Sequence, residues 1–123
     1  MSCTDDGSIL DSWSLLRRVH HSQVVPDGNT GKSRVSSGAF KDQEMSVDAE
    51  ELLQASGANW RKSLEGYEGY SLVRFPAAHP RTLGLPVCHK PLPDNSAHTE
   101  VHGKKTGSIA NKFVAAAQWV YLV

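Results

Sequence analysis

The chain has 123 residues, of which 39% are hydrophobic and 21% are charged, and these values are typical of one globular domain. Thirteen basic and thirteen acidic residues leave a net charge of zero, which disfavours a nucleic-acid-binding module because such modules are usually basic. The sequence has no apolar stretch near the roughly 20 residues that a membrane span requires, and it has no secretory signal pattern.

The first half of the chain predicts few regular elements. Residues 1–12 are mostly polar and predict a disordered tail, so that 13–123 form the single domain. Periodicity from Ile9 to Val19 fits either a helix or a strand, and we favour a strand over 14–19. Residues 20–33 are rich in turn formers and predict a loop or a wide hairpin.

Within this loop, residues 26–33 read Pro-Asp-Gly-Asn-Thr-Gly-Lys-Ser, which is close to the Walker phosphate-binding sequence. A Walker loop begins with glycine, whereas this segment begins with Pro26, which has no backbone N–H to hold a phosphate. Residues 34–38 also make a poor start for the helix that should follow. We therefore predict no nucleotide-hydrolase loop.

Short strands or extended segments are expected at 35–40 and 45–47. Asp48 and Glu51 then form a capping-box pattern, which predicts a helix over 49–56. Residues 59–69 predict a short helix or an irregular turn.

The second half predicts strands and a final helix. Strands are expected at 70–75, 83–89 and 98–102, the second of them at a sheet edge because it contains Gly84 and Pro86. Apolar residues at helical spacing predict a helix over 108–122. Together the elements predict an α+β fold: about five mostly antiparallel strands with two or three helices, and the C-terminal helix packed on the sheet.

Polar residues concentrate around 34–48, within an otherwise apolar pattern. Arg34 precedes Ser36 and Ser37, and Gly38 beside them would let a ligand approach the backbone. Lys104 and Lys105 precede the final helix, whose N-terminus favours anions. The predicted anion-binding residues are Arg34, Ser36, Ser37, Ser46, Lys104 and Lys105. The alternative interpretation is a turn at Ser36–Gly38 and a helix cap with solvent-facing lysines.

A second group of candidates lies on the strand at 98–102. His98, Glu100 and His102 would point the same way, but residues four apart on a strand lie about 13 Å apart, too far for two imidazoles to share an ion. We therefore predict no metal site and no cofactor. As weak catalytic candidates we name His98 and Glu100 as acid or base, and Arg18 as a phosphate clamp.

Cys3 lies in a polar segment and Cys88 in an apolar one. Two cysteines in such unlike settings predict no disulfide framework, and two thiols need histidine to complete a zinc site. We therefore expect a reducing, cytoplasmic location.

Several motifs together resemble a family of small bacterial proteins with no assigned activity. They are Leu16–Val19 (LRRV), Arg34–Phe40 (RVSSGAF), Met45–Asp48 (MSVD), Pro91–His98 (PLPDNSAH) and Gly103–Thr106 (GKKT). The resemblance covers nearly the whole chain beyond the tail. It implies that the matching polar and aromatic residues matter, namely Arg18, Arg34, Ser36, Ser37, Phe40, Ser46, Asp48 and His98.

A weaker likeness is to ADP-ribosyltransferases, which use an early arginine, a central serine and a late glutamate. Arg18, Ser36 or Ser37, and Glu100 occur in that order.

Three functional hypotheses follow. The first is a binding or effector module for a phosphate-bearing or other anionic ligand. The second is an enzyme acting on a nucleotide or a nucleic-acid end. The third is a protein-protein interaction module without a ligand pocket. The expected partner is accordingly a phosphate-bearing small molecule or another protein, and not a membrane.

Overall fold

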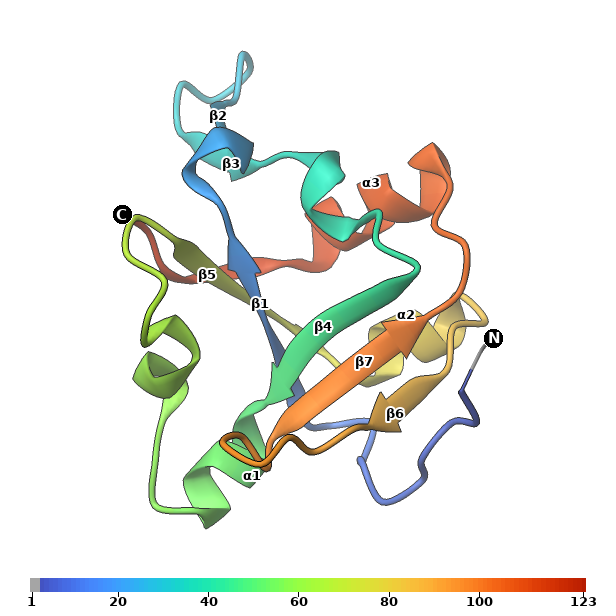
Figure 1. Cartoon of the computed structure of the whole chain (residues 1–123). Coiled ribbons are helices and arrows are strands. Elements are labelled where there is room, and N and C mark those ends of the chain that lie inside the picture. The colour runs from blue at the N-terminus through green and yellow to red at the C-terminus, as the bar shows by residue number, and fades with distance from the viewer. Residues whose placement is uncertain (1–2) are drawn as a thin grey trace.

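The structure, a computed structural model, describes residues 3–123. Six strands form one antiparallel sheet in the order β6-β7-β4-β1-β5-β8 (Figure 1). These strands are β1 (Ser14–Val19), β4 (Glu44–Ala49), β5 (Ser71–Pro76), β6 (Val87–His89), β7 (His98–His102) and β8 (Gln118–Tyr121). A separate hairpin pairs β2 (Val24–Pro26) with β3 (Ser33–Val35). The predicted α+β fold is confirmed.

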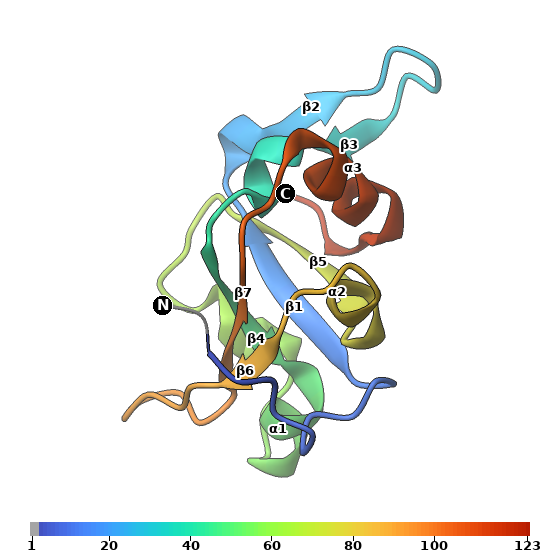
Figure 2. The same cartoon turned by 90° about the vertical axis from the view of Figure 1, so that its right-hand side faces the viewer.

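The helices are short and lie on both sides of the sheet. The α-helices are α1 (Glu50–Ala55), α2 (Ala78–Thr82) and α3 (Gly107–Ala116), and the 3-10 helices are η1 (His21–Gln23), η2 (Ser37–Phe40) and η3 (Trp60–Leu64). Helices α2 and α3 cover one face, and the segment around residue 60 lies on the other (Figures 1 and 2).

The main core lies between the sheet and α3. Residues along a strand alternate between the two faces of the sheet. Val47, Val73 and Phe75 point to the face that α3 covers, and they belong to the main apolar cluster. The Phe40 ring from η2 stacks on the Phe113 ring from α3, with 5.4 Å between their centroids. The C-terminal helix is therefore packed on the sheet as predicted.

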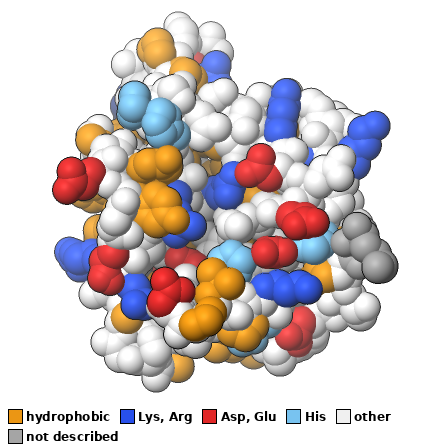
Figure 3. All heavy atoms as spheres, in the orientation of Figure 1, with side chains coloured by type: hydrophobic (Ala, Val, Ile, Leu, Met, Phe, Trp, Pro, Cys, Tyr) orange, Lys and Arg blue, Asp and Glu red, His pale blue; other side chains and the backbone are white. Residues whose placement is uncertain are grey.

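The opposite face of the sheet combines a small apolar cluster with many polar side chains. Leu16 and Leu72 pack there against Leu53 of α1. Further along the same face, Arg18, Ser46, Asp48 and His98 make the sheet polar. Figure 3 shows charged side chains of both signs and histidines side by side on this side of the molecule.

The N-terminal segment is part of the folded domain. Ile9 is 1% exposed, and the Asp6 N–H donates to the Val87 carbonyl at 2.8 Å. Residues 3–12 thus differ from the disordered tail that we expected, because an apolar anchor and hydrogen bonds to β6 hold them. Met1 and Ser2, also assigned to the tail, lie outside the described residues.

Cys3 and Cys88 form a disulfide. The expectation that they would not pair was wrong, because the fold brings the N-terminal segment alongside β6, where Cys88 lies. The two cysteines therefore give no support for a reducing compartment.

Four predicted elements were wrong in part, and one of them is the strand expected at 83–89, which begins only at Val87. The expected strand at 35–40 ends at Val35, and η2 begins after Ser36, whose side chain accepts the Gly38 N–H. Asp48 does not cap α1; the N-cap is Ala49, without a side-chain bond, because Asp48 has tertiary partners. The expected helix over 108–122 ends at Ala116, and the chain then joins β5 as β8.

The Walker-like segment forms the turn of the β2–β3 hairpin and leads into a strand, not a helix. This agrees with the rejection of a nucleotide-hydrolase loop. Among the described residues, no helix has the length and apolar character needed to cross a membrane.

Candidate functional site

A cavity of about 420 Å³ opens on the polar face of the sheet. Strands β1, β4 and β7 form its floor, and η3 and the loop 90–97 form its walls. Its polar lining includes Arg18, Ser46, Asp48, Ser63, Asn95 and His98. Strand register explains the gathering, since Asp48 pairs with Leu16 on one side and with His98 on the other.

Asp48 lies at the bottom of this cavity and is 1% exposed. The Ser63 hydroxyl donates to its Oδ2 at 2.6 Å, and the Asn95 amide donates to its Oδ1 at 2.8 Å. The Arg18 guanidinium lies 3.6 Å from the same Oδ2. Since a buried carboxylate is tolerated only with such partners, Asp48 joins β1, η3 and the loop 90–97 into one structure.

Besides Asp48, two contacts hold Arg18 at the cavity wall. Its Nη1 donates to the Ser63 carbonyl at 3.1 Å, and its guanidinium carbon lies 4.1 Å from the centroid of the Tyr67 ring. Among the described residues, none accepts a hydrogen bond from its Nε or Nη2 atoms. Arg18 therefore keeps donors that could bind a carboxylate or a phosphate.

His98 and Ser46 form a hydrogen-bonded pair in the same cavity. The His98 Nδ1 lies 2.8 Å from the Lys90 carbonyl oxygen, which can only accept, so Nδ1 carries the proton. In the neutral ring Nε2 then carries no proton, and it faces the Ser46 hydroxyl at 3.3 Å. A hydroxyl that contacts an imidazole, which a third group orients, is the arrangement of an activated nucleophile and its base.

The structure brings together only some of the predicted site residues. Ser46, Arg18 and His98 line the cavity. Glu100 shares a sheet face with them but contacts His102 at 2.7 Å instead. The other predicted residues, Arg34, Ser36, Ser37, Lys104 and Lys105, are not part of the cavity lining.

The predicted anion site around Arg34 therefore does not form as expected. Arg34 is exposed on the β2–β3 hairpin. Ser36 caps η2 and Ser37 begins it, and η2 packs against α3 on the opposite face of the sheet. The order of residues that resembles ADP-ribosyltransferases is thus not assembled in space, because these serines and Arg18 lie on different faces.

Lys105 has a structural role in place of the predicted one. Its ammonium donates to the carbonyl oxygens of Asp42, Val101 and Gly103 at 2.6, 2.9 and 3.0 Å. Burial, reinforced by the charge of Arg17, lowers its pKa to about 8. Lys105 is therefore neither the predicted anion-binding residue nor the solvent-facing lysine of the alternative interpretation, because it is buried and backbone acceptors occupy its donors. Thr106, next in the chain, caps α3.

Sequence reasoning missed Ser63, Asn95 and the role of Asp48. Asn95 lies in a loop predicted only from its prolines, and Ser63 lies in an element predicted only as a helix or turn. One sequence signal could have indicated Ser63 and Asn95, because both are small polar residues in connecting segments near buried strands. Functional residues are often found in such connecting segments.

A scan of family models gave no match, and neither curated proteins nor solved structures gave a significant one.

The site must accordingly be interpreted from its chemistry. Of the eight residues that the family resemblance marks, four line this cavity: Arg18, Ser46, Asp48 and His98. They come from β1, β4 and β7, which are far apart in the chain.

Proposed function

We propose that this protein is an enzyme that transfers or hydrolyses an ester group, with Ser46 as the nucleophile and His98 as the general base. The observation that carries the proposal is the orientation of His98: the Lys90 carbonyl holds the Nδ1 proton, which leaves Nε2 to accept from Ser46. The distance of 3.3 Å between Nε2 and Oγ is long for this bond, as is common before substrate binds.

The chemical steps follow from these positions. Ser46 Oγ attacks the carbon or phosphorus of the ester while its proton moves to His98 Nε2. The bond to the leaving oxygen then breaks, and the leaving alcohol takes that proton. Water repeats the sequence to release the acyl or phosphoryl group. The Lys90 carbonyl stabilises the imidazolium that forms in between, because it accepts from Nδ1 throughout.

The charges of the cavity support a substrate that carries an anionic group. Arg18 and Lys62 line it and offer donors to a carboxylate or phosphate. Glu65 and Asp94 also line it, so a ligand with a donor or positive group elsewhere would be favoured over a simple anion. Nucleotides meet both requirements and are the first class to test. The proposed substrate thus keeps the anionic group of the binding-module hypothesis, but Arg18 takes the place of Arg34 as the residue that binds it.

A bacterial, cytoplasmic setting is part of the proposal. The bacterial origin derives from the resemblance of the sequence motifs. In a reducing cytoplasm the Cys3–Cys88 disulfide would form only transiently, as is usual for the disulfides of that compartment.

The direct test is labelling with an alkyl fluorophosphonate, which needs no knowledge of the substrate. Ser46 Oγ would form a bond to phosphorus, and fluoride would leave with the serine proton. Mass spectrometry should place the adduct on Ser46 in the native chain. Ser46→Ala should abolish this labelling and His98→Gln should slow it at least tenfold, whereas Ser36→Ala, at a serine outside the cavity, should not change it.

Hydrolysis assays then separate the two chemistries. Nitrophenyl acetate and nitrophenyl phosphate distinguish acyl from phosphoryl transfer, and Arg18→Gln should reduce hydrolysis of anionic esters more than of neutral ones. Labelling that is equally fast in His98→Gln would refute the proposed base. Absence of both labelling and hydrolysis in the native chain would refute the enzyme.

A further inference from the structure

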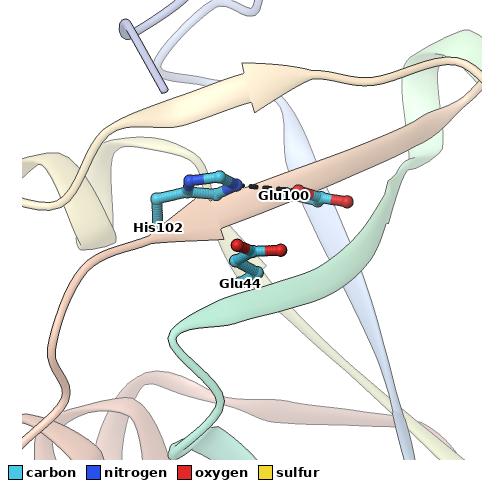
Figure 4. Close-up of side chains that lie close together, drawn as sticks. All are labelled: Glu44, Glu100 and His102. Carbon is cyan, nitrogen blue, oxygen red and sulfur yellow. Dashed lines mark hydrogen bonds and ion pairs between the residues drawn. The ribbon is translucent and has the colours of Figure 1, made fainter. Parts of the chain in front are cut away.

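A second cluster of functional side chains lies beside the cavity, on β4 and β7. Glu44 pairs with His102 across the two strands, and Glu100 lies on the same face. One ligand atom from each of these residues lies within 4.8 Å of the others. In Figure 4 the Glu44 carboxylate points from β4 toward Glu100 and His102 on β7.

The donor set suits a divalent transition-metal ion. Zinc is bound by histidine nitrogen and carboxylate oxygen at about 2.0–2.2 Å, and a site with three protein ligands leaves a position for water. Glu44 is exposed and free to rotate, whereas His102 is 5% exposed and fixed. The exposed Glu44 side chain is therefore the one that can move toward the ion. The sequence prediction of no metal site rested on the separation of His98 and His102 along one strand, whereas Glu44 comes from the neighbouring strand.

The hydrogen bonds of His102 currently place its proton where a metal would bind. The Cys3 backbone N–H donates to His102 Nδ1 at 3.1 Å, so Nδ1 is unprotonated and the single proton of the neutral ring is on Nε2. That Nε2–H donates to Glu100 Oε1 at 2.7 Å. A metal ion at Nε2 requires the proton to move to Nδ1, where it would face the Cys3 N–H, donor against donor.

The disulfide keeps Cys3 in this position. It ties Cys3 to Cys88 of β6, and Cys88 pairs with Glu100 across β6 and β7. Apart from this bond, Cys3 is held among the described residues by the hydrogen bond from its N–H to His102, whereas the next backbone hydrogen bond to β6 is made three residues on, by Asp6. Release of Cys3 would let His102 take the other tautomer and offer Nε2 to a metal.

We propose that Glu44, Glu100 and His102 form a binding site for a divalent transition-metal ion, and that the Cys3–Cys88 disulfide keeps it closed. A dithiol reductant opens it: two electrons and two protons convert the disulfide to two thiols while the dithiol becomes a cyclic disulfide. Cys3 then leaves His102, and the ring changes tautomer: Nε2 loses its proton, and Nδ1 gains one. The metal ion binds to Nε2.

Zinc titration by calorimetry tests both parts. Because free thiols also bind zinc, the open state is represented by the double variant Cys3→Ser/Cys88→Ser and compared with the oxidised native chain. We expect zinc binding at least tenfold tighter in the double variant. Adding Glu44→Gln or His102→Gln to that variant should weaken binding at least tenfold, and adding His21→Gln, at an exposed histidine outside the cluster, should leave it unchanged.

Nitrogen NMR of the His102 ring provides a readout that a folding defect would not imitate. The oxidised chain should show the proton on Nε2, and the zinc-loaded double variant should show it on Nδ1. Equal zinc affinity in the oxidised chain and the double variant would refute control by the disulfide. Zinc binding that survives His102→Gln, or no binding by the double variant, would refute the site itself. None of these outcomes depends on the chemistry proposed for Ser46.

Discussion

Replacement of Asp48 by asparagine tests the hydrogen-bond network that shapes the cavity. The substitution keeps the volume of a side chain that is 1% exposed and removes its charge. The new amide oxygen can keep the bond from Asn95, which cannot turn round because its own oxygen accepts the Ala97 N–H at 3.1 Å. The amide nitrogen must then face Ser63 and the Arg18 guanidinium, which is itself a donor.

The expected loss can be worked out from these contacts. A hydrogen bond to a charged group contributes about 1.5–3 kcal/mol and one between neutral groups about 1 kcal/mol. Two bonds to Asp48 become neutral, and the contact with Arg18, which is partly exposed, contributes only about 0–1 kcal/mol. We expect the free energy of unfolding to fall by about 2–3 kcal/mol, which lowers Tm by roughly 6–12 °C in a domain of this size.

Urea denaturation followed by tryptophan fluorescence measures this change. The matched control is Asp94→Asn, at an exposed carboxylate that lines the same cavity, and it should change the free energy of unfolding by less than about 0.5 kcal/mol. An Asp48→Asn variant as stable as this control would show that Asp48 does not hold the cavity walls together.

Three further predictions concern other parts of the fold. Gly103→Ala should destabilise the protein by about 1–3 kcal/mol in urea denaturation, because φ is 116° and the new Cβ would lie 2.6 Å from Leu85 Cδ2. Burial lowers the pKa of Lys105 from its ordinary value of 10.5 to about 8. Between these two pH values the unfolded chain binds more protons than the folded one, so the contribution of Lys105 to the free energy of unfolding rises with pH. A Lys105→Met variant should lose this rise in stability. The Cys3→Ser/Cys88→Ser variant removes a cross-link between residues with a sequence separation of 85. Its Tm should fall by an amount equivalent to a loss of about 4 kcal/mol or less in the free energy of unfolding. An unchanged Tm would contradict a disulfide in the native chain.

The polar face of the sheet was partly predictable from alternation along the strands. The patterns at 14–19 and 98–102 correctly gave β1 and β7, and alternation puts Arg18 on one face of β1 and His98 on one face of β7. What alternation cannot give is strand order. Because β4 lies next to β7 in the sheet, the Ser46 side chain contacts His98. This contact depends on the pairing of segments that are far apart in the chain.

The failed predictions have a common physical cause: tertiary partners overrode local preference. Asp48 has the sequence of a helix cap, but Ser63 and Asn95 bind its carboxylate. The apolar spacing of 108–122 continues past Ala116, yet the residues after it gain backbone hydrogen bonds by pairing with β5. Local patterns hold no information on these partners, because each lies 15 or more residues away in the chain.

The N-terminal segment also has a consequence for how the protein should be handled. The hydrogen bonds from Asp6 to Val87, and from the Val87 N–H to the Asp5 carboxylate at 2.9 Å, occupy the outer backbone groups of β6. A strand with free backbone groups on its outer side is a template on which further molecules can pair and aggregate. Removal of the first dozen residues, as in a trimmed expression clone, would uncover that template, so fusion tags should leave residues 3–12 intact.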